Sequence, residues 1–351
     1  MKRITLKTKV EATLAILLLI TIAAASVTSL TRTISDSYDD FETFIRNSEG
    51  NCWKCTGENV QAAIDDIGAD GGKIWVGGDI TLSSELKIDN VGMIDGSEYY
   101  TIIDFQGHRI TLEGDMTCIN LTRARHVTIE NLYIKPTLKH TASIIKLYIG
   151  PEGAGNTKYI RFNTFRNINI ESGGGWVPGL GWSEHNYTGI ELHHNGDCSS
   201  FLCNTFENIQ MEGLGTGILF NQENAAGWAN GNYFENIWLD QYVTAIHFKR
   251  NPSAQFSFNQ NVFTHIKAQT AAFTEYGVRN ICGNGNHFDH ILMWDWYAAH
   301  TSGSAVYEYS IDNSASSTYI NAHVWHDNGL YVNDEGSNTM LIANGKIQIG
   351  G

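Results

Sequence analysis

The chain has 351 residues, of which 37 are acidic and 23 basic, and its formal net charge is −14. That charge would repel nucleic acid phosphates and anionic membrane surfaces, so neither is expected as a partner. The 35 glycines against 4 prolines, with 11% aromatic residues, are typical of an ordered, turn-rich protein and exclude a disordered one.

The first 30 residues combine a basic start with an apolar stretch. Four basic residues lie among the first nine, and residues 12–31 hold no charge. Two interpretations fit: a signal peptide cut near Ala23–Ser26, or an uncleaved membrane anchor, since about 20 apolar residues span a bilayer. Both place the remaining chain at the cell surface or in the medium. Glycosylation sequons at Asn120 and Asn186 agree with export.

Residues 31–55 are polar and acidic, and we interpret them as a stalk before a domain over residues 56–351. Cys52 and Cys55 favour a structural bridge or an inert pair over redox chemistry, because no βαβ pattern surrounds them. Cys198 and Cys203 bracket four residues, a spacing that can close a disulfide loop. The other two cysteines are isolated and are expected to be buried apolar residues: Cys118 and Cys282.

The domain begins with a predicted amphipathic helix over residues 58–67, ended by Gly71-Gly72. Strands are predicted over residues 73–76, 80–82 and 85–88. The helix motif Val-Gln-Ala-Ala-Ile-Asp, the Gly-Gly, the apolar strand and the Ser-Ser-Glu-Leu-Lys-Ile strand resemble the entrance of the pectate lyase superfamily, which includes many viral tailspikes. The resemblance implies a right-handed parallel β-helix whose first rung is capped by the helix. The chain departs from the family's frequent proline–glycine turn, with Gly77-Gly78-Asp79 in its place.

An internal repeat follows, and its period of about 28 residues indicates a stacked repeat architecture, or solenoid. An Asn-x-Phe segment recurs at five positions: Asn163, Asn204, Asn232, Asn261 and Asn286. A second strand recurs at Gly189, Gly217, Ala245, Gly277 and Ala305. Earlier apolar alternations predict strands over residues 102–105, 110–112, 127–129 and 132–134. We therefore expect an all-β fold with three strands per rung.

Each repeat changes its inward face once, at an asparagine. In the best-matched copy Phe206 and Ile209 both point inward, so the alternation slips by one residue at Asn208. Asparagine tolerates the left-handed backbone that such a bend needs. Stacked Asn167, Asn208 and Asn236 are expected to form a hydrogen-bonded ladder. His265 and His290 continue this column, and we interpret them as ladder substitutes rather than catalysts.

The outward side of the strands that begin at Gly189 and its equivalents is the first candidate site, because the resembled family has its substrate groove there. Its catalytic candidates are Glu191, His193, His247, Lys249 and Arg279. Its substrate-binding candidates are Trp176, Trp182, Asn221, Trp228 and Tyr307. The tryptophans fit either stacking on sugar rings or closing the core beneath long loops.

A second outward column holds three carboxylates: Glu171, Glu212 and Asp240. Carboxylates one rung apart either bind a cation such as Ca²⁺ or raise one another's pKa. Their spacing also suits a glycosidase pair, and it equally suits a solvated acidic face, which the acidic composition favours.

Function remains open among three classes. No complete catalytic motif of polygalacturonases or calcium-dependent lyases is found, which favours a surface or virion adhesin that binds polysaccharide along the solenoid. A polysaccharide lyase or glycoside hydrolase is the first alternative, and a self-assembling subunit of a trimer or filament is the second. Strands predicted over residues 330–332, 339–343 and 346–349 lack a capping helix, which favours association.

Overall fold

The chain divides into two units, residues 1–43 and residues 44–351, and the residues that can be placed all belong to the second. The computed structural model describes residues 45–46, 52–55, 59–68, 71–91, 93–94, 97–98, 100–137, 139–151, 159–172, 176–177, 181–182, 187–196, 200–254, 258–294, 307–324 and 330–350. The predicted signal or anchor segment, Asn186 and Cys198 lie outside this part. Among the described residues, no helix has the length and apolarity needed to cross a bilayer.

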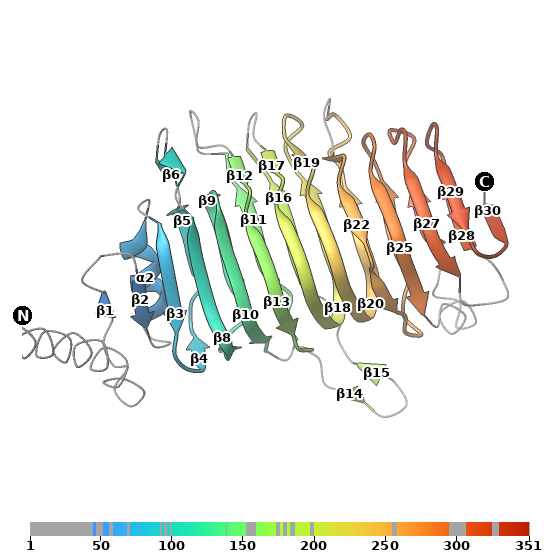
Figure 1. Cartoon of the computed structure of the whole chain (residues 1–351). Coiled ribbons are helices and arrows are strands. Elements are labelled where there is room, and N and C mark those ends of the chain that lie inside the picture. The colour runs from blue at the N-terminus through green and yellow to red at the C-terminus, as the bar shows by residue number, and fades with distance from the viewer. Residues whose placement is uncertain are drawn as a thin grey trace, which may run out of the picture. The chain divides into compact units, whose positions relative to one another are not determined.

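The described part is almost entirely β-structure, as predicted, and its strands lie side by side from one end to the other (Figure 1). Two long parallel ladders organise it. Ladder 1 contains β5 (Leu86–Val91), β9 (Ile119–Ala124), β11 (Ser143–Ile149), β16 (Thr188–His194), β24 (Tyr276–Ile281), β26 (Tyr307–Ile311), β28 (Leu330–Asp334) and β30 (Ile347–Gly350). Two long strands run through both ladders: β18 (Thr205–Gln222) and β20 (Tyr233–Lys249).

Ladder 2 carries the strands that begin after the Asn-x-Phe asparagines, together with the strands upstream of them. It contains β3 (Gly72–Val76), β4 (Ile80–Leu82), β8 (Thr101–Leu112), β10 (Val127–Lys135), β13 (Thr164–Ile170), β22 (Val262–Thr264), β23 (Lys267–Gln269), β25 (His287–Trp294), β27 (Tyr319–Val324) and β29 (Met340–Ala343).

A short third ladder and three small antiparallel pairs complete the described strands. Ladder 3 contains β12 (Tyr159–Arg161), β17 (Ser200–Leu202), β19 (Trp228–Asn230) and β21 (Phe258–Asn259). The antiparallel pairs are β1 (Ile45–Arg46) with β2 (Cys52–Cys55), β6 (Met93–Ile94) with β7 (Ser97–Glu98), and β14 (Trp176–Val177) with β15 (Gly181–Trp182).

The register of ladder 2 confirms the predicted repeat. Equivalent residues of successive Asn-x-Phe segments are direct neighbours: Thr164 pairs with Thr205, Thr205 with Tyr233, Tyr233 with Val262, and Val262 with His287. The phenylalanine of each segment is buried, and its ring stacks on the next at 4.7 to 4.9 Å. The stacked rings belong to Phe165, Phe206, Phe234, Phe263 and Phe288.

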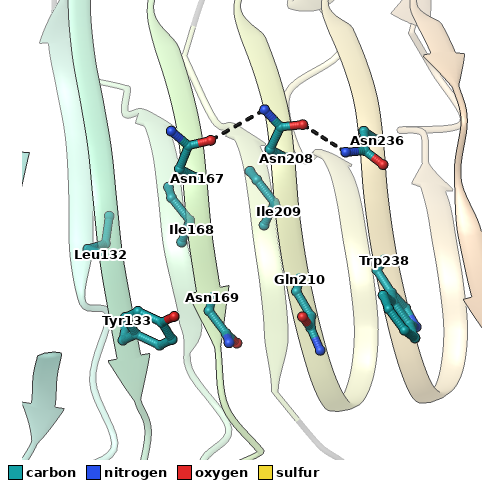
Figure 2. Close-up of a pocket in the computed structure, with 10 residues that line it drawn as sticks. All are labelled: Leu132, Tyr133, Asn167, Ile168, Asn169, Asn208, Ile209, Gln210, Asn236 and Trp238. Atoms are coloured by element: carbon teal, nitrogen blue, oxygen red, sulfur yellow. Dashed lines mark hydrogen bonds between the residues drawn. The ribbon is translucent and has the colours of Figure 1, made fainter. Parts of the chain in front are cut away.

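The predicted left-handed turn is confirmed. Asn208 has φ 55° and Asn236 has φ 52°, and their amides form the outer asparagine ladder with Asn167 (Figure 2). His265 and His290 take the same backbone conformation, with φ 54° and 53°, and their rings stack at 5.0 Å. They occupy the column as ladder substitutes, as expected.

A second, buried asparagine ladder was not predicted. The Oδ1 atom of Asn204 accepts two hydrogen bonds from Asn163, one from its backbone N–H at 3.2 Å and one from its side-chain Nδ2 at 3.0 Å. Asn232 repeats both contacts toward Asn204 at 3.1 and 3.0 Å. Asn261 and Asn286 extend the series. Each of these side chains is almost wholly buried. The first residue of every Asn-x-Phe segment is therefore a structural hydrogen-bonding group.

Helix α2 (Val60–Ile67) forms where predicted and covers one end of the ladders (Figure 1). It packs against β2, β3 and β5 and buries its apolar face, which consists of Val60, Ala63, Ile64 and Ile67. Burial there removes apolar core at the stack end from water.

Replacement of Asn204 by alanine tests the buried ladder. The change leaves the N–H groups of Asn163 without their acceptor inside the core, so we expect the free energy of unfolding to fall by about 3 kcal/mol. Asn208→Gly is the matched control, because glycine keeps the left-handed turn and only an exposed amide is lost. Urea unfolding measures both. Equal losses in the two variants would contradict a special role for the buried ladder.

Candidate functional site

The outward side of ladder 1 brings the predicted catalytic residues together. Lys146, Glu191 and Leu219 are neighbours across β11, β16 and β18, and the row continues with His247 on β20 and Arg279 on β24. A second row contains Tyr148, His193, Asn221 and Lys249. Both rows have the order that strand alternation predicts.

Glu191 is the centre of a buried polar cluster rather than an open catalytic carboxylate. Only 6% of the residue is exposed. Its Oε2 accepts the Ser143 hydroxyl at 2.6 Å, and its Oε1 accepts the Asn221 amide at 2.9 Å. The Lys146 ammonium lies 3.8 Å from Oε2. These contacts compensate the cost of burying the charge.

His193 lies between two carboxylates. Its Nδ1 is 3.3 Å from Glu191 and its Nε2 is 3.1 Å from Glu223, and neither contact has the alignment of a hydrogen bond. The ring meets Tyr148 edge-on, with 5.1 Å between the ring centroids. A histidine ring that lies between two carboxylates is an arrangement that can transfer protons.

Farther along ladder 1 lies a cationic patch, which we define as His247, Lys249, Tyr276 and Arg279. The Arg279 guanidinium lies 4.7 Å from the Tyr276 ring centroid. Within the described part of the chain, neither Lys249 nor Arg279 forms an ion pair. Burial, with the nearby charges of Arg279 and Lys249, lowers the pKa of His247 from 6.5 to about 4, so this ring is neutral at physiological pH.

The substrate-binding candidates are only partly brought together. Tyr307 pairs with Tyr276 and not with Arg279, so the register expected from Ala305 is wrong. The reason is core packing, since the observed register buries Tyr309 and Ile311 against ladder 1. Asn221 is 6% exposed and holds Glu191, which makes it a support for the cluster rather than a free ligand-binding amide.

The three tryptophans belong to other elements. Trp228 is half-buried in β19, opposite Ser200 of ladder 3, instead of lying in a loop beside the groove. Trp176 and Trp182 pair across the β14–β15 hairpin, and their side chains lie outside the described residues. A role for these tryptophans in sugar stacking stays a prediction.

The described cysteines favour structural over redox roles. Cys55 is buried with a free thiol, and burial raises its pKa to about 12. Burial likewise raises the pKa of Cys118, and that of Cys282 to about 12. A thiol with so high a pKa is a poor nucleophile. Cys203 is exposed, and its bridge to Cys198, which lies outside the described residues, stays a prediction.

The acidic column forms as predicted on ladder 2. Glu212 pairs with Asp240, and burial together with the Asp240 charge raises the pKa of Glu212. Burial raises the pKa of Asp240. Glu171 is paired instead with Arg109 at 2.9 Å. Within the described ranges, no group of three or more His, Cys, Asp or Glu residues is arranged to hold a metal ion. Burial, more than mutual repulsion, therefore raises the pKa values of Glu212 and Asp240, and the described residues offer no support for the calcium alternative.

The sequon asparagine Asn120 lies half-buried in β9, and its Nδ2 donates to Glu85 at 3.2 Å.

Comparison with protein families finds no family model that matches the chain, and no curated protein matches it either. The functional argument therefore depends on the geometry of these faces.

Titration of His247 makes stability depend on pH. Between pH 6.5 and about 4 the unfolded chain binds a proton at this position that the folded chain does not, so stability falls as the pH falls through that window. The loss is about 3 kcal/mol at 1.36 kcal/mol per pKa unit. Urea unfolding from pH 7 to 4 should show a shallower slope for His247→Gln and an unchanged slope for exposed His323→Gln. Identical slopes in all three proteins would refute the assignment.

Glu212→Gln should stabilise the fold at pH 7. A raised carboxyl pKa means that the folded state loses stability as pH rises above the ordinary value of 4.5, and glutamine removes this charge while keeping an acceptor for Gln210. Solvent screening of the half-buried group keeps the gain modest. Thermal unfolding should show a higher midpoint for the variant than for the wild type at pH 7. The two midpoints should not differ in this way at pH 3. Glu207→Gln, beside Arg166, is the control and should not stabilise at pH 7.

Proposed function

We propose that the chain is an exported surface protein with a right-handed parallel β-helix of the pectate lyase superfamily type, and that it recognises an acidic polysaccharide along ladder 1. The parallel ladders, the repeat register and the position of α2 support this fold. The resemblance of residues 60–88 to the superfamily entrance supports the family, and the basic and apolar start of the sequence supports export.

The cationic patch is the observation that carries the proposal. The whole chain has a net charge of −14, yet Lys249 and Arg279 lie together on ladder 1 without an ion-pair partner in the described part. Arginine binds a carboxylate or sulfate through two parallel hydrogen bonds, and lysine supplies a second positive charge. Tyr276 adds an aromatic face on which a sugar ring can stack.

The outward rows of ladder 1 also suit an extended polysaccharide chain. Neighbouring strands lie about 4.8 Å apart, so outward side chains of ladder 1 form rows that run across the strands. An extended polysaccharide along these rows would meet the cationic patch and then the Glu191 cluster. The neutral state of His247 keeps it available as both a donor and an acceptor for sugar hydroxyls.

A polysaccharide lyase is the second candidate, and the placement of His193 between Glu191 and Glu223 favours it. Recognition is preferred, because Glu191 is sequestered by Ser143 and Asn221.

Binding of polygalacturonate, hyaluronate and neutral dextran to the purified chain tests the proposal. We expect binding of an acidic polymer, and a loss of about tenfold in affinity for Lys249→Gln and for Arg279→Gln, equivalent to about 1.4 kcal/mol each. Lys346→Gln is the control for net charge, because this lysine is exposed on another part of the chain.

Isothermal titration calorimetry gives the affinities, and absorbance of unsaturated uronates in the same samples detects lyase activity. Equal binding by wild type and both patch variants would contradict recognition by the cationic patch. Cleavage by the wild type that is lost in His193→Gln would contradict a purely binding function and support the polysaccharide lyase instead.

A further inference from the structure

A groove of about 360 Å³ lies on the outward side of ladder 2, away from the residues of the cationic patch (Figure 2). It crosses β10, β13, β18 and β20, and half of its lining residues carry carboxamide side chains, with an aromatic residue at each end. Figure 2 shows Tyr133, Asn169, Gln210 and Trp238 in one row, and Asn167, Asn208 and Asn236 in a second.

The two aromatic side chains of the groove are exposed, whereas many other aromatic side chains of the protein are buried in the core. Tyr133 is 43% exposed and Trp238 is 37% exposed. The register places them in one row, with Asn169 and Gln210 between them. Three strand spacings of about 4.8 Å separate the aromatics by about 14 Å. Two exposed ring faces at this separation can each hold one unit of a short oligomer.

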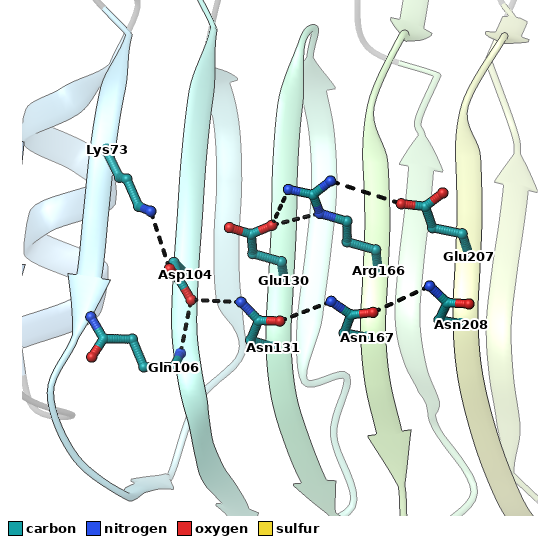
Figure 3. A network of polar contacts seen from close by, with 9 residues as sticks. All are labelled: Lys73, Asp104, Gln106, Glu130, Asn131, Arg166, Asn167, Glu207 and Asn208. Carbon is teal, nitrogen blue, oxygen red and sulfur yellow. Dashed lines mark hydrogen bonds and ion pairs between the residues drawn. The ribbon is translucent and has the colours of Figure 1, made fainter.

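The outer asparagine ladder gives the groove a wall with fixed orientation (Figure 3). Asn131 donates to the carboxylate of Asp104 at 3.0 Å. Asn167 then donates to Asn131 at 3.0 Å, and Asn208 donates to Asn167 at 3.3 Å. Because a carboxylate only accepts, Asp104 turns every amide nitrogen of the series toward itself.

Asn236 completes the series with a bond of 2.7 Å to Asn208. A carboxamide has two N–H donors and two lone pairs, and the ladder bonds use one of each at Asn167 and Asn208. The second donor and the second lone pair of each amide remain for a ligand. The wall therefore presents alternating donors and acceptors in fixed positions.

The row between the aromatics adds two further amides. The Asn169 Oδ1 atom is hidden from solvent and has no hydrogen-bond partner among the described residues. Gln210 donates to Glu212 at 3.1 Å, which orients its carbonyl oxygen away from that carboxylate. An unpaired buried acceptor is costly, and a turn of the Asn169 amide toward a ligand hydroxyl in the groove would remove that cost.

We propose that this groove binds a neutral oligosaccharide, with sugar rings on Tyr133 and Trp238 and hydroxyl groups on the amides of Asn167, Asn169 and Asn208. A sugar hydroxyl donates and accepts at once, as the free positions of these amides require. The apolar face of a sugar ring matches an exposed aromatic side chain. The groove is a second saccharide site, independent of the cationic patch.

Charge distinguishes the ligand of this groove from that of ladder 1. The carboxylates of Glu171, Glu212 and Asp240 form the next outward column of ladder 2, and Glu212 contacts Gln210 of the groove. Glu212 and Asp240 would repel uronate or sulfate groups, whereas Glu171 is paired with Arg109 and the Lys267 ammonium lies 6.0 Å from the Trp238 ring centroid. Neutral sugars carry no such penalty.

The test titrates the full-length chain with cellohexaose, maltohexaose and N-acetylchitohexaose in a calorimeter. We expect at least one of them to bind, with about tenfold weaker affinity for Trp238→Ala and for Tyr133→Ala. Phe162→Ala is the matched control, because Phe162 is 42% exposed and lies outside the groove. Thermal unfolding of each variant checks that the fold is kept.

Trp238→Phe should retain most of the affinity, since it keeps a ring face. Lys249→Gln should leave hexasaccharide binding unchanged, which separates this groove from the cationic patch. Absence of binding to all three hexasaccharides would overturn the proposal. Binding that survives both alanine variants would overturn it as well, whatever the outcome for acidic polymers on ladder 1.

Discussion

The buried asparagine ladder is the interaction on which the other features depend. From Asn204 to Asn286, each of its side chains accepts from the backbone and side chain of the preceding asparagine. Its own amide donates to a main-chain carbonyl, as Asn204 does to Ile160 at 3.1 Å. Buried polar groups are stable only when they are paired, so a slip of one residue would leave several of them unpaired. This pairing sets the register of ladder 2. The stacked phenylalanines and the outward columns then follow from strand alternation.

A fixed register lets neighbouring repeats carry different chemistry without disturbing the core. On ladder 1 the outward row changes from Glu191 through Leu219 and His247 to Arg279. On ladder 2 the row from Tyr133 to Trp238 has amides between its aromatic ends. The protein thereby separates a cationic surface from a neutral and acidic one on the same set of strands. We regard this separation as the basis of its two proposed saccharide sites.

The sequence predicts the all-β class, the inward phenylalanines and the left-handed asparagines, because these depend on local alternation and on backbone preference. Glu191 and His193 were correctly placed on one outward face, yet their burial was not foreseen. Burial depends on Ser143 and Asn221, which lie on neighbouring strands far away in the sequence. The asparagine that opens every Asn-x-Phe segment was a visible signal for the buried ladder.

The register of Tyr307 and the groove on ladder 2 could not be predicted for a related reason. The segment between Asn286 and Tyr307 is longer than the corresponding segments of the three preceding repeats, so a match by Ala305 alone shifts the strand. Tyr133 lies upstream of the regular repeats, where no motif reveals that it shares a row with Trp238. Outward columns that join irregular and regular repeats become visible only once the strands are paired.

Amide hydrogen exchange tests the central role of the buried ladder most directly. The backbone N–H groups of Asn163, Asn204 and Asn232 donate to the side chains of the following asparagines. They should exchange only through global unfolding, and so rank among the slowest in the protein. Exchange at these three positions as fast as at frayed strand ends, with slow exchange elsewhere in ladder 2, would contradict the conclusion that this ladder holds the repeats in register.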